Sequence, residues 1–452
     1  MPDCRRFWQT KPRRPSPVRN NPLLIPKSFL NMKSSLEFIT IRKVSEIKVP
    51  ATLVLLPLFW CSATVFSQTV VAPVQPASKY QPQVTQQSTE PLTNAITQPA
   101  VPTFLQWGPV TAHPRASYRY VSSTGVQYKP GSATDTTIQT LSPGILLGVG
   151  THWSLDYQAS WNFYSSREFK DTLDHAINLL GSAAYENWTF NLSQGFSRSS
   201  QSLVETGRQT QQDQYSTGFT ALDRIDSHLI LETVGSQSLT SPTDFNDTKE
   251  WSLLEWLHFR FSQQLDTALG AGAGYVEVNN GADANYYKFL GRIDWRPGSK
   301  LNLHLDGGLD HRRIRTGSAN YINNPIANAS VGYKLFEHTI LMIGATRTVT
   351  ASYFSNQTQK NLSWNAALDQ RLLGRINLNL SAGYQKSTYE QTALGDAAAR
   401  NDNNHWYDVR LSTVVLRRGS VSIFYHRGKN SSSTPGYGFT SDQYGTELRY
   451  QY

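Results

Sequence analysis

The residues best suited to chemistry in this 452-residue chain are a histidine and two aspartates separated by two and four positions, His304, Asp306 and Asp310. A histidine beside carboxylates is a common general acid–base arrangement, so a hydrolytic site is one interpretation. In an extended strand the three side chains lie on one face, because successive side chains alternate. The other interpretation is a solvated wall, and we favour it because charge pairs of this kind are often structural.

No other part of the sequence completes a catalytic or metal-binding set. It contains no Gly-x-Ser-x-Gly, no His-Glu-x-x-His and no phosphate-binding loop, and its ten histidines lack ligand spacing. Gly270, Gly272 and Gly274 alternate with other small residues inside a strand with no helix after it, so we expect them to lie beside bulky aromatics. The sequence therefore predicts no enzyme, no catalytic residues, no metal and no cofactor.

Charged residues of both signs recur at alternate positions in three segments. They are Lys288, Arg292 and Asp294 in one strand, Asp408 and Arg410 in another, and Glu447 and Arg449 in the last. Neighbouring charges of opposite sign spare a polar face the cost of an unpaired charge. Such residues either set a preference for ions or solutes or pair only to hold the wall, and both interpretations stay open.

The elements that must position these residues are β-strands. From Trp153 to Phe163 every odd-numbered residue is apolar and every even-numbered residue is polar. This alternating length, with aromatics at both ends, matches a tilted strand that spans a membrane. The same alternation recurs in residues 301–309 and 376–384. A helical membrane protein would instead need several apolar runs of about 20 residues, and the chain has one candidate.

Two kinds of turn alternate between the strands. Tight turns fall near residues 150–151, 186–187, 223–224, 261–264, 297–299, 336–337, 373–374 and 418–419, roughly every 37 residues. Looser polar segments fall between them, for example residues 122–134 and 200–207. Eight tight and nine loose turns make about 18 strands, with 16 as the alternative count. An even number puts both ends on the tight-turn side, which is the periplasm in bacterial barrels.

An open sheet of this width would leave two unpaired edges, and each unsatisfied backbone group costs several kcal/mol in hydrocarbon. A soluble propeller or solenoid is the rival, but here one face carries Trp, Tyr and Leu while the other carries Asp, Asn, Arg and Gln. The sequence predicts an all-β fold, an antiparallel transmembrane β-barrel over residues 113–452 with short periplasmic turns and longer outer loops. The residues expected to line its lumen are Lys288, Arg292, Asp294, His304, Asp306, Asp310, Asp408, Arg410, Glu447 and Arg449.

Residues 1–67 have the layout of an N-terminal extension plus a secretory signal peptide. Basic residues precede the apolar run 49–60, and small residues precede a cut after Ser67. Residues 68–112 are rich in Pro and Gln and predict a disordered periplasmic leader. Residues 1–67 hold 11 Lys and Arg against 3 Asp and Glu, which leaves 31 against 30 in the rest of the chain. We therefore expect no nucleic-acid partner.

The last strand carries a recognisable ending. Gln443, Gly445, Leu448, Tyr450 and Tyr452 match the sorting signal of bacterial outer-membrane β-barrels position by position. That pattern is a polar residue, a glycine two positions on, apolar or aromatic residues three and five after the glycine, and a terminal aromatic. Residues 113–452 as a whole resemble outer-membrane β-barrels of the porin families, including barrels associated with exopolysaccharide export.

The resemblance implies location in the cell outer membrane. It implies outer-membrane lipid and lipopolysaccharide, the barrel-assembly machinery and polysaccharide-export components as partners. The expected function is a porin-like channel for passage of small solutes or for export of polysaccharide. The alternative is a non-conducting scaffold that displays loops in an envelope assembly.

Two further expectations concern the ends of the lumen. No loop looks long enough to narrow it, so the leader, folding back, is one candidate restriction. Arg312, Arg313 and Arg315 adjoin an expected outer loop, where they either meet anionic lipopolysaccharide or polysaccharide or lie solvated, and solvation is the default.

Overall fold

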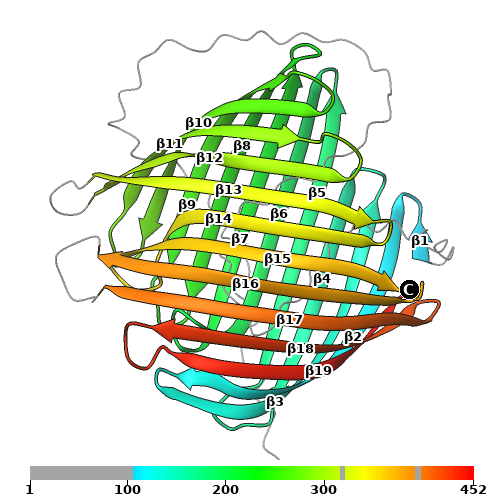
Figure 1. The fold of residues 1–452 in the computed structure, drawn as a ribbon, viewed down its shortest axis with the longest axis vertical. Helices are drawn as coiled ribbons and strands as arrows, with labels where there is room; N and C mark the ends of the chain where they lie inside the picture. The colour runs from blue at the N-terminus through cyan, green and yellow to red at the C-terminus, as the bar shows by residue number, and fades with distance from the viewer. Residues whose placement is uncertain (1–104, 316–320, 392–398) are drawn as a thin grey trace, which may run out of the picture. The chain divides into compact units, whose positions relative to one another are not determined.

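The computed structural model describes residues 105–315, 321–391 and 399–452, and these form a closed antiparallel β-barrel (Figure 1). A two-residue strand, β1 (Gln106–Trp107), pairs with the start of β2. Each strand from β2 to β19 pairs with the next, and β19 pairs with β2 to close the ring. Among the described residues, no helix is long and apolar enough to cross a membrane. The predicted signal peptide and most of the predicted leader lie outside the described residues.

The barrel strands vary in length from 12 to 20 residues. In chain order they are β2 (Val110–Lys129), β3 (Ser132–Val149), β4 (Trp153–Tyr164), β5 (Thr172–Tyr185), β6 (Trp188–Leu203), β7 (Arg208–Arg224), β8 (Leu229–Pro242), β9 (Thr248–Arg260), β10 (Leu265–Val278), β11 (Ala284–Trp295), β12 (Leu301–Ile314), β13 (Tyr321–Phe336), β14 (Thr339–Ala351), β15 (Gln357–Leu372), β16 (Ile376–Gln391), β17 (Arg400–Leu416), β18 (Gly419–Ser432) and β19 (Phe439–Gln451).

The predicted fold class and the count of 18 barrel strands are confirmed. The eight tight turns lie where the sequence predicts them, within about two residues, and at the same end of the barrel as Val110 and the C-terminus. β2 begins at Val110, slightly before the expected boundary at residue 113.

The looser segments at the other end differ from the expectation, because much of their length is paired strand. The expected loop at residues 122–134 is reduced to residues 130–131, and the one at 200–207 to residues 204–207. A polar stretch of sequence is therefore not always a loop, because its backbone can still be paired. In an antiparallel hairpin that continues beyond the apolar band, polar side chains are solvated while the ladder still satisfies the backbone.

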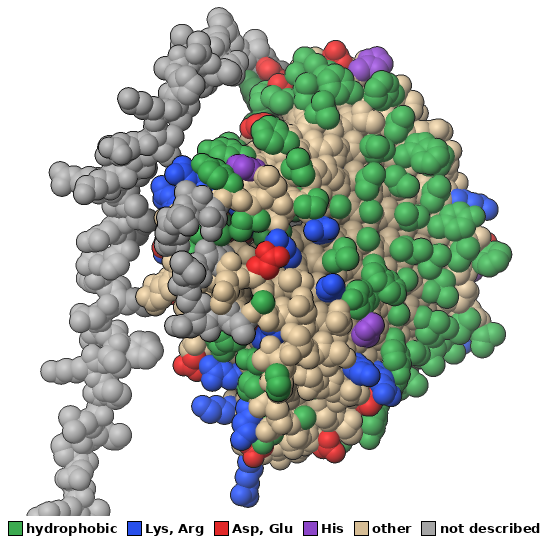
Figure 2. Space-filling model, turned by 60° about the vertical axis from the view of Figure 1, so that its left-hand side comes forward, with side chains coloured by type: hydrophobic (Ala, Val, Ile, Leu, Met, Phe, Trp, Pro, Cys, Tyr) green, Lys and Arg blue, Asp and Glu red, His purple; other side chains and the backbone are tan. Residues whose placement is uncertain are grey.

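The two faces of each strand differ as the alternation predicts. In β4, Trp153, Tyr157 and Trp161 are exposed on the outside, whereas Ser160 and Asn162 face inward and are buried. In β19, Tyr444, Leu448 and Tyr450 are exposed on the outside, whereas Gln443 and Glu447 are buried. Figure 2 shows hydrophobic side chains spread over the outer wall with few charged side chains among them. This exterior suits hydrocarbon and not water.

Two glycines of β10 make room for aromatic rings on the inner wall. A Cβ added at Gly270 would lie 2.6 Å from the ring of Trp256, and one added at Gly274 would lie 2.2 Å from Cζ of Tyr286. Both rings are almost fully buried, and the Tyr286 hydroxyl donates to Glu250 at 2.7 Å. The expectation that the three glycines lie beside bulky aromatics is confirmed for Gly270 and Gly274 and is wrong for Gly272, where an added Cβ would lie 2.7 Å from Leu254 Cδ1.

Candidate functional site

One group of charged side chains lies on the inner face of β8 to β12 and is called the acidic group below. Its members are Glu232, His258, Asp266, Arg292, Asp294, His304 and Asp306. The ladder between β11 and β12 places Arg292 opposite Asp306 and Asp294 opposite His304. Because partners in an antiparallel ladder point to the same face, the register alone brings these charges together.

Arg292 is the central cation of the acidic group. Its Nε donates to Asp306 at 2.8 Å, and its Nη1 donates to Glu232 at 3.0 Å. Its guanidinium carbon also lies 4.0 Å from the ring centroid of Trp256. Two carboxylates and a ring therefore fix this side chain, and a fixed planar cation is a suitable element for sorting charged solutes.

Both histidines of the acidic group lie between two carboxylates. His304 contacts Asp294 through Nδ1 at 2.7 Å and Asp306 through Nε2 at 3.0 Å. His258 contacts Asp266 through Nδ1 at 3.0 Å and Glu232 through Nε2 at 2.9 Å. With both ring nitrogens engaged by acceptors, neither ring offers a free nitrogen as a general base. The structural interpretation of the histidine is thus better supported by this geometry than the hydrolytic one.

A second group lies on the inner face of β17, β18, β19 and β2 and is called the arginine group below. Its members are Arg119, Asp408, Arg410, His426, Glu447 and Arg449. Glu447 accepts from Arg410 Nη1 at 3.0 Å and from Arg449 Nε, and it lies opposite Arg119 in the ladder that closes the barrel. His426 Nδ1 lies 2.7 Å from Asp408.

The two groups face each other across the barrel. Counted along the ring, β10 and β19 are nine strands apart in either direction, so their walls are opposite. A histidine that contacts a carboxylate through each ring nitrogen donates from both and is charged. The acidic group therefore holds four carboxylates against Arg292 and two imidazolium rings, whereas the arginine group holds three arginines against two carboxylates. The wall that carries the acidic group is thus the more negative of the two.

The structure places all ten predicted lumen residues on the inner face. Eight belong to the two groups. Of the other two, Asp310 pairs with Arg312 at 3.1 Å, and the Lys288 ammonium lies 4.6 Å from the ring centroid of Tyr286. Their role in transport stays a prediction.

Sequence reasoning missed five members of these groups, Arg119, Glu232, His258, Asp266 and His426. Each occupies an inward position, which the alternation of its own strand could have revealed. Their pairing partners depend on the register between strands, which no single strand encodes.

One expectation about the outer loops is wrong. Arg312 is buried inside the barrel, paired with Asp310, and it does not lie in a solvated loop. It is an even-numbered residue of β12 and shares the inward face with His304 and Asp306. Arg313 points the other way and its guanidinium carbon lies 5.7 Å from the ring centroid of Tyr321. Within the described ranges, no group of three or more His, Cys, Asp or Glu could hold a metal ion.

The sequence matches no family model, and no curated protein matches it. Solved structures with a similar path include OpdL of Pseudomonas aeruginosa, at 16% identity and a TM-score of 0.42, covering 76% of this chain and 99% of that one. OpdQ of the same organism is 12% identical with a TM-score of 0.43, covering 76% and 98%. OccAB3 of Acinetobacter baumannii is 10% identical with a TM-score of 0.41, covering 75% and 99%.

Proposed function

We propose that this outer-membrane β-barrel is a porin-like channel that passes small polar solutes. The observation that carries the proposal is the wall itself, a closed ring of 18 strands with apolar side chains outside and two opposed groups of charges inside. Barrels of 16 to 18 strands enclose an aqueous space too wide for their own side chains to fill. Charges on an inner wall are stable only when they are paired or when water reaches them.

The polarised lumen supports a preference for dipolar solutes. A zwitterion or a polar sugar that crosses between the acidic group and the arginine group aligns with the field between the walls, whereas an apolar molecule gains nothing there. Fixed side chains such as Arg292 would make this preference stereochemical as well as electrostatic.

Export of polysaccharide is a narrower form of the same proposal. Its support is the resemblance of residues 113–452 to barrels associated with exopolysaccharide export. An extended sugar chain would need the same polar wall as a small solute, so the wall itself supports both forms.

The non-conducting scaffold remains the second candidate, and one observation favours it. The charges of both groups are largely engaged with one another, as in the contacts of Arg292 with Asp306 and of Arg410 with Glu447. Paired charges can hold a wall without selecting any solute.

The test is conductance of the full chain, purified from membranes and inserted into a planar bilayer in KCl. A shift of mobility on heating in gel electrophoresis serves as the control for a folded barrel. Ion flux through the folded protein supports the channel. The channel is contradicted, and the scaffold favoured, if the folded wild type conducts no ions and the variants Glu205→Ala and Ser352→Ala, which loosen the outer mouth, conduct none either.

A further inference from the structure

At the end of the barrel opposite the tight turns, called the outer end, hydrogen bonds join two turns. Glu205, in the turn between β6 and β7, accepts from Ser352 Oγ at 2.6 Å and from the Tyr353 backbone N–H at 2.8 Å. Ser352 and Tyr353 belong to the turn between β14 and β15. All three residues are buried, with exposed fractions of 2%, 0% and 3%. A buried carboxylate with two donors is a firm contact and not a chance encounter of solvated loops.

The two turns rise from nearly opposite walls. From β7 to β14 the ring counts seven steps, and from β15 through β19 and β2 to β6 it counts nine. A direct contact between their tips therefore requires chain to pass across the mouth of the lumen.

The hairpin of β14 and β15 supplies part of this crossing by leaning inward. Val349 and Ala351 share the strand face that carries Ile343, which is exposed on the outside, yet both are buried. Ala351 packs in one cluster with Val276 and Tyr286 of the inner wall. Only a hairpin that leaves the wall and folds over the lumen brings its outer face against the inner face of β10 and β11.

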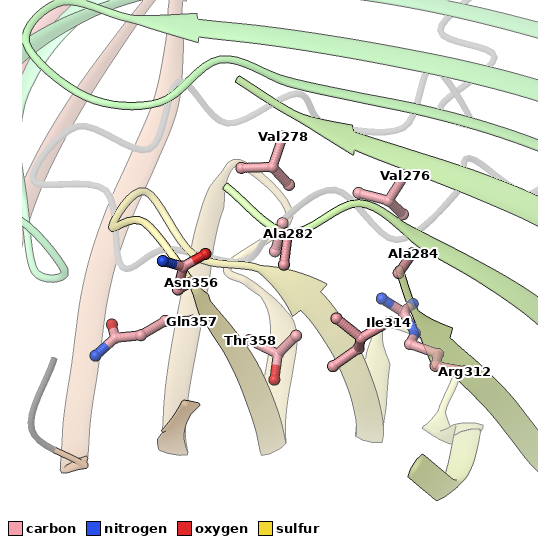
Figure 3. A pocket seen from close by; sticks show the side chains of 10 residues that line it. Val276, Val278, Ala282, Ala284, Arg312, Ile314, Asn356, Gln357 and Thr358 are labelled. Atoms are coloured by element: carbon pink, nitrogen blue, oxygen red, sulfur yellow. The ribbon is translucent and has the colours of Figure 1, made fainter. Parts of the chain in front are cut away.

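One further hydrogen bond holds the leaning hairpin. Arg312 Nη2, from β12, donates to the Val349 carbonyl at 3.0 Å and so reaches past β13. Figure 3 shows the seam, a small pocket with Val276, Ile314 and Arg312 on one side and Gln357 on the other.

The hairpin of β6 and β7 is held from its other sides. Arg400 Nη2, at the start of β17, donates to the Glu205 carbonyl at 3.0 Å. The Arg400 guanidinium carbon lies 4.0 Å from the ring centroid of Tyr389 and 4.2 Å from that of Tyr437. On the side of β2, Ser202 Oγ donates to the Gln127 carbonyl. The β6–β7 hairpin thus contacts β2, β17 and the turn between β14 and β15 at its tip.

We propose that this bridge is a gate for the channel. In the state described here the turn at residues 204–207 closes the outer mouth, and passage requires Glu205 to separate from Ser352 and Tyr353. The inference rests on the proposed channel function, and it assigns the restriction to the barrel's own hairpins.

The first test compares the wild-type full chain with Glu205→Ala and Ser352→Ala in planar bilayers in KCl. Removing the carboxylate takes away the acceptor that the Ser352 hydroxyl and the Tyr353 backbone N–H share, and the only other acceptor near that hydroxyl among described contacts is Gln357 Oε1 at 3.4 Å. The closed state therefore loses more stability than the open state, which does not have these bonds. We expect the fraction of time open to rise at least about fivefold, which corresponds to about 1 kcal/mol. Asp213→Ala is the matched control, because it breaks a carboxylate contact with Arg198 on the outer surface and away from the mouth.

The second test locks the bridge. In a chain with Cys4 and Cys61 replaced by serine, Glu205→Cys and Ser352→Cys are joined by a short bis-maleimide or by oxidation. We expect conductance to fall on cross-linking and, for the disulfide, to return on reduction.

The outcomes separate the two proposals. Equal, steady conductance in wild type, Glu205→Ala and the cross-linked form overturns the gate and leaves the channel intact. Silence in all folded forms, the opened variants included, overturns both. Conductance that rises in Glu205→Ala and not in Asp213→Ala supports both.

Discussion

Glu447, five residues from the end of the chain, lies directly opposite Arg119 in the ladder between β19 and β2. The seam that closes the barrel is therefore also part of the arginine group. Glu447 is buried and is the shared acceptor of Arg410 and Arg449, so three guanidinium groups gather around one carboxylate.

We expect Glu447→Gln to destabilise the barrel by about 2 kcal/mol, because two hydrogen bonds to a charged acceptor weaken and three cations lose their counter-charge. The same change makes the arginine wall more positive, so anion selectivity should rise. Urea unfolding in lipid vesicles and the reversal potential in a KCl gradient measure the two effects. Glu255→Gln is the matched control, since Glu255 is on the outer face and accepts from Thr233 alone among described contacts. An equal loss in both variants would contradict a special role for the seam.

On the opposite wall, we expect Arg292→Ala to shift selectivity toward cations. The change removes the central arginine of the acidic group and releases Glu232 and Asp306, while Arg260 stays 3.8 Å from Asp266. The reversal potential in a KCl gradient should move in the direction opposite to that of Glu447→Gln. Arg292→Lys keeps the positive charge but cannot donate to both Asp306 and Glu232 in the same geometry. This variant should therefore keep the wild-type reversal potential but have a lower free energy of unfolding than the wild type. An unchanged potential in Arg292→Ala would mean that these charges only hold the wall.

Much of the fold could be predicted because the barrel repeats a local rule. Alternation from Trp153 to Phe163 fixes both the element and the face that meets lipid, and the tight turns must be short wherever two strands reverse directly. The inward position of residues such as His304 and Arg410 follows from the same rule.

The partners of those residues could not be predicted. Arg292 meets Glu232 across β9 and β10, and Glu205 meets Ser352 across the whole mouth, so both contacts depend on register, tilt and closure of the ring. The bridge was also hidden by composition, because polar segments near residues 200–207 read as free loops when they are the ends of paired hairpins. The absence of a long loop therefore did not mean the absence of a restriction.

The turn between β7 and β8 should show a pH dependence of its own. The Asp226 carboxylate accepts from the backbone N–H groups of His228 at 2.6 Å and Leu229 at 2.8 Å, and these bonds lower the pKa of Asp226. A depressed pKa means that the stabilisation is present above the ordinary pKa of an aspartate and is lost as pH falls through the lower, folded value.

We therefore expect hydrogen-exchange protection of the His228 and Leu229 amides, corrected for intrinsic rates, to fall below about pH 4 in the wild type. In Asp226→Ala the protection should be low at every pH. The Ser182 amide, which donates to the His152 carbonyl at the short turn between β3 and β4, is the internal control and should change in neither protein. Equal protection of the Leu229 amide in both proteins at neutral pH would contradict the role of Asp226.

Gly274→Ala tests how tightly the inner wall is packed. An added Cβ would lie 2.2 Å from Cζ of Tyr286, whose hydroxyl donates to Glu250, so the ring must move and strain or break that bond. We expect a loss of about 1–3 kcal/mol, as for overpacking of a filled interior. Gly291→Ala, in the adjacent strand β11, is the matched control because nothing lies within 4 Å of its added Cβ. Urea unfolding followed by tryptophan fluorescence measures both. If Gly274→Ala were as stable as Gly291→Ala, the ring of Tyr286 would have room to move, and packing on this wall would not explain the glycine.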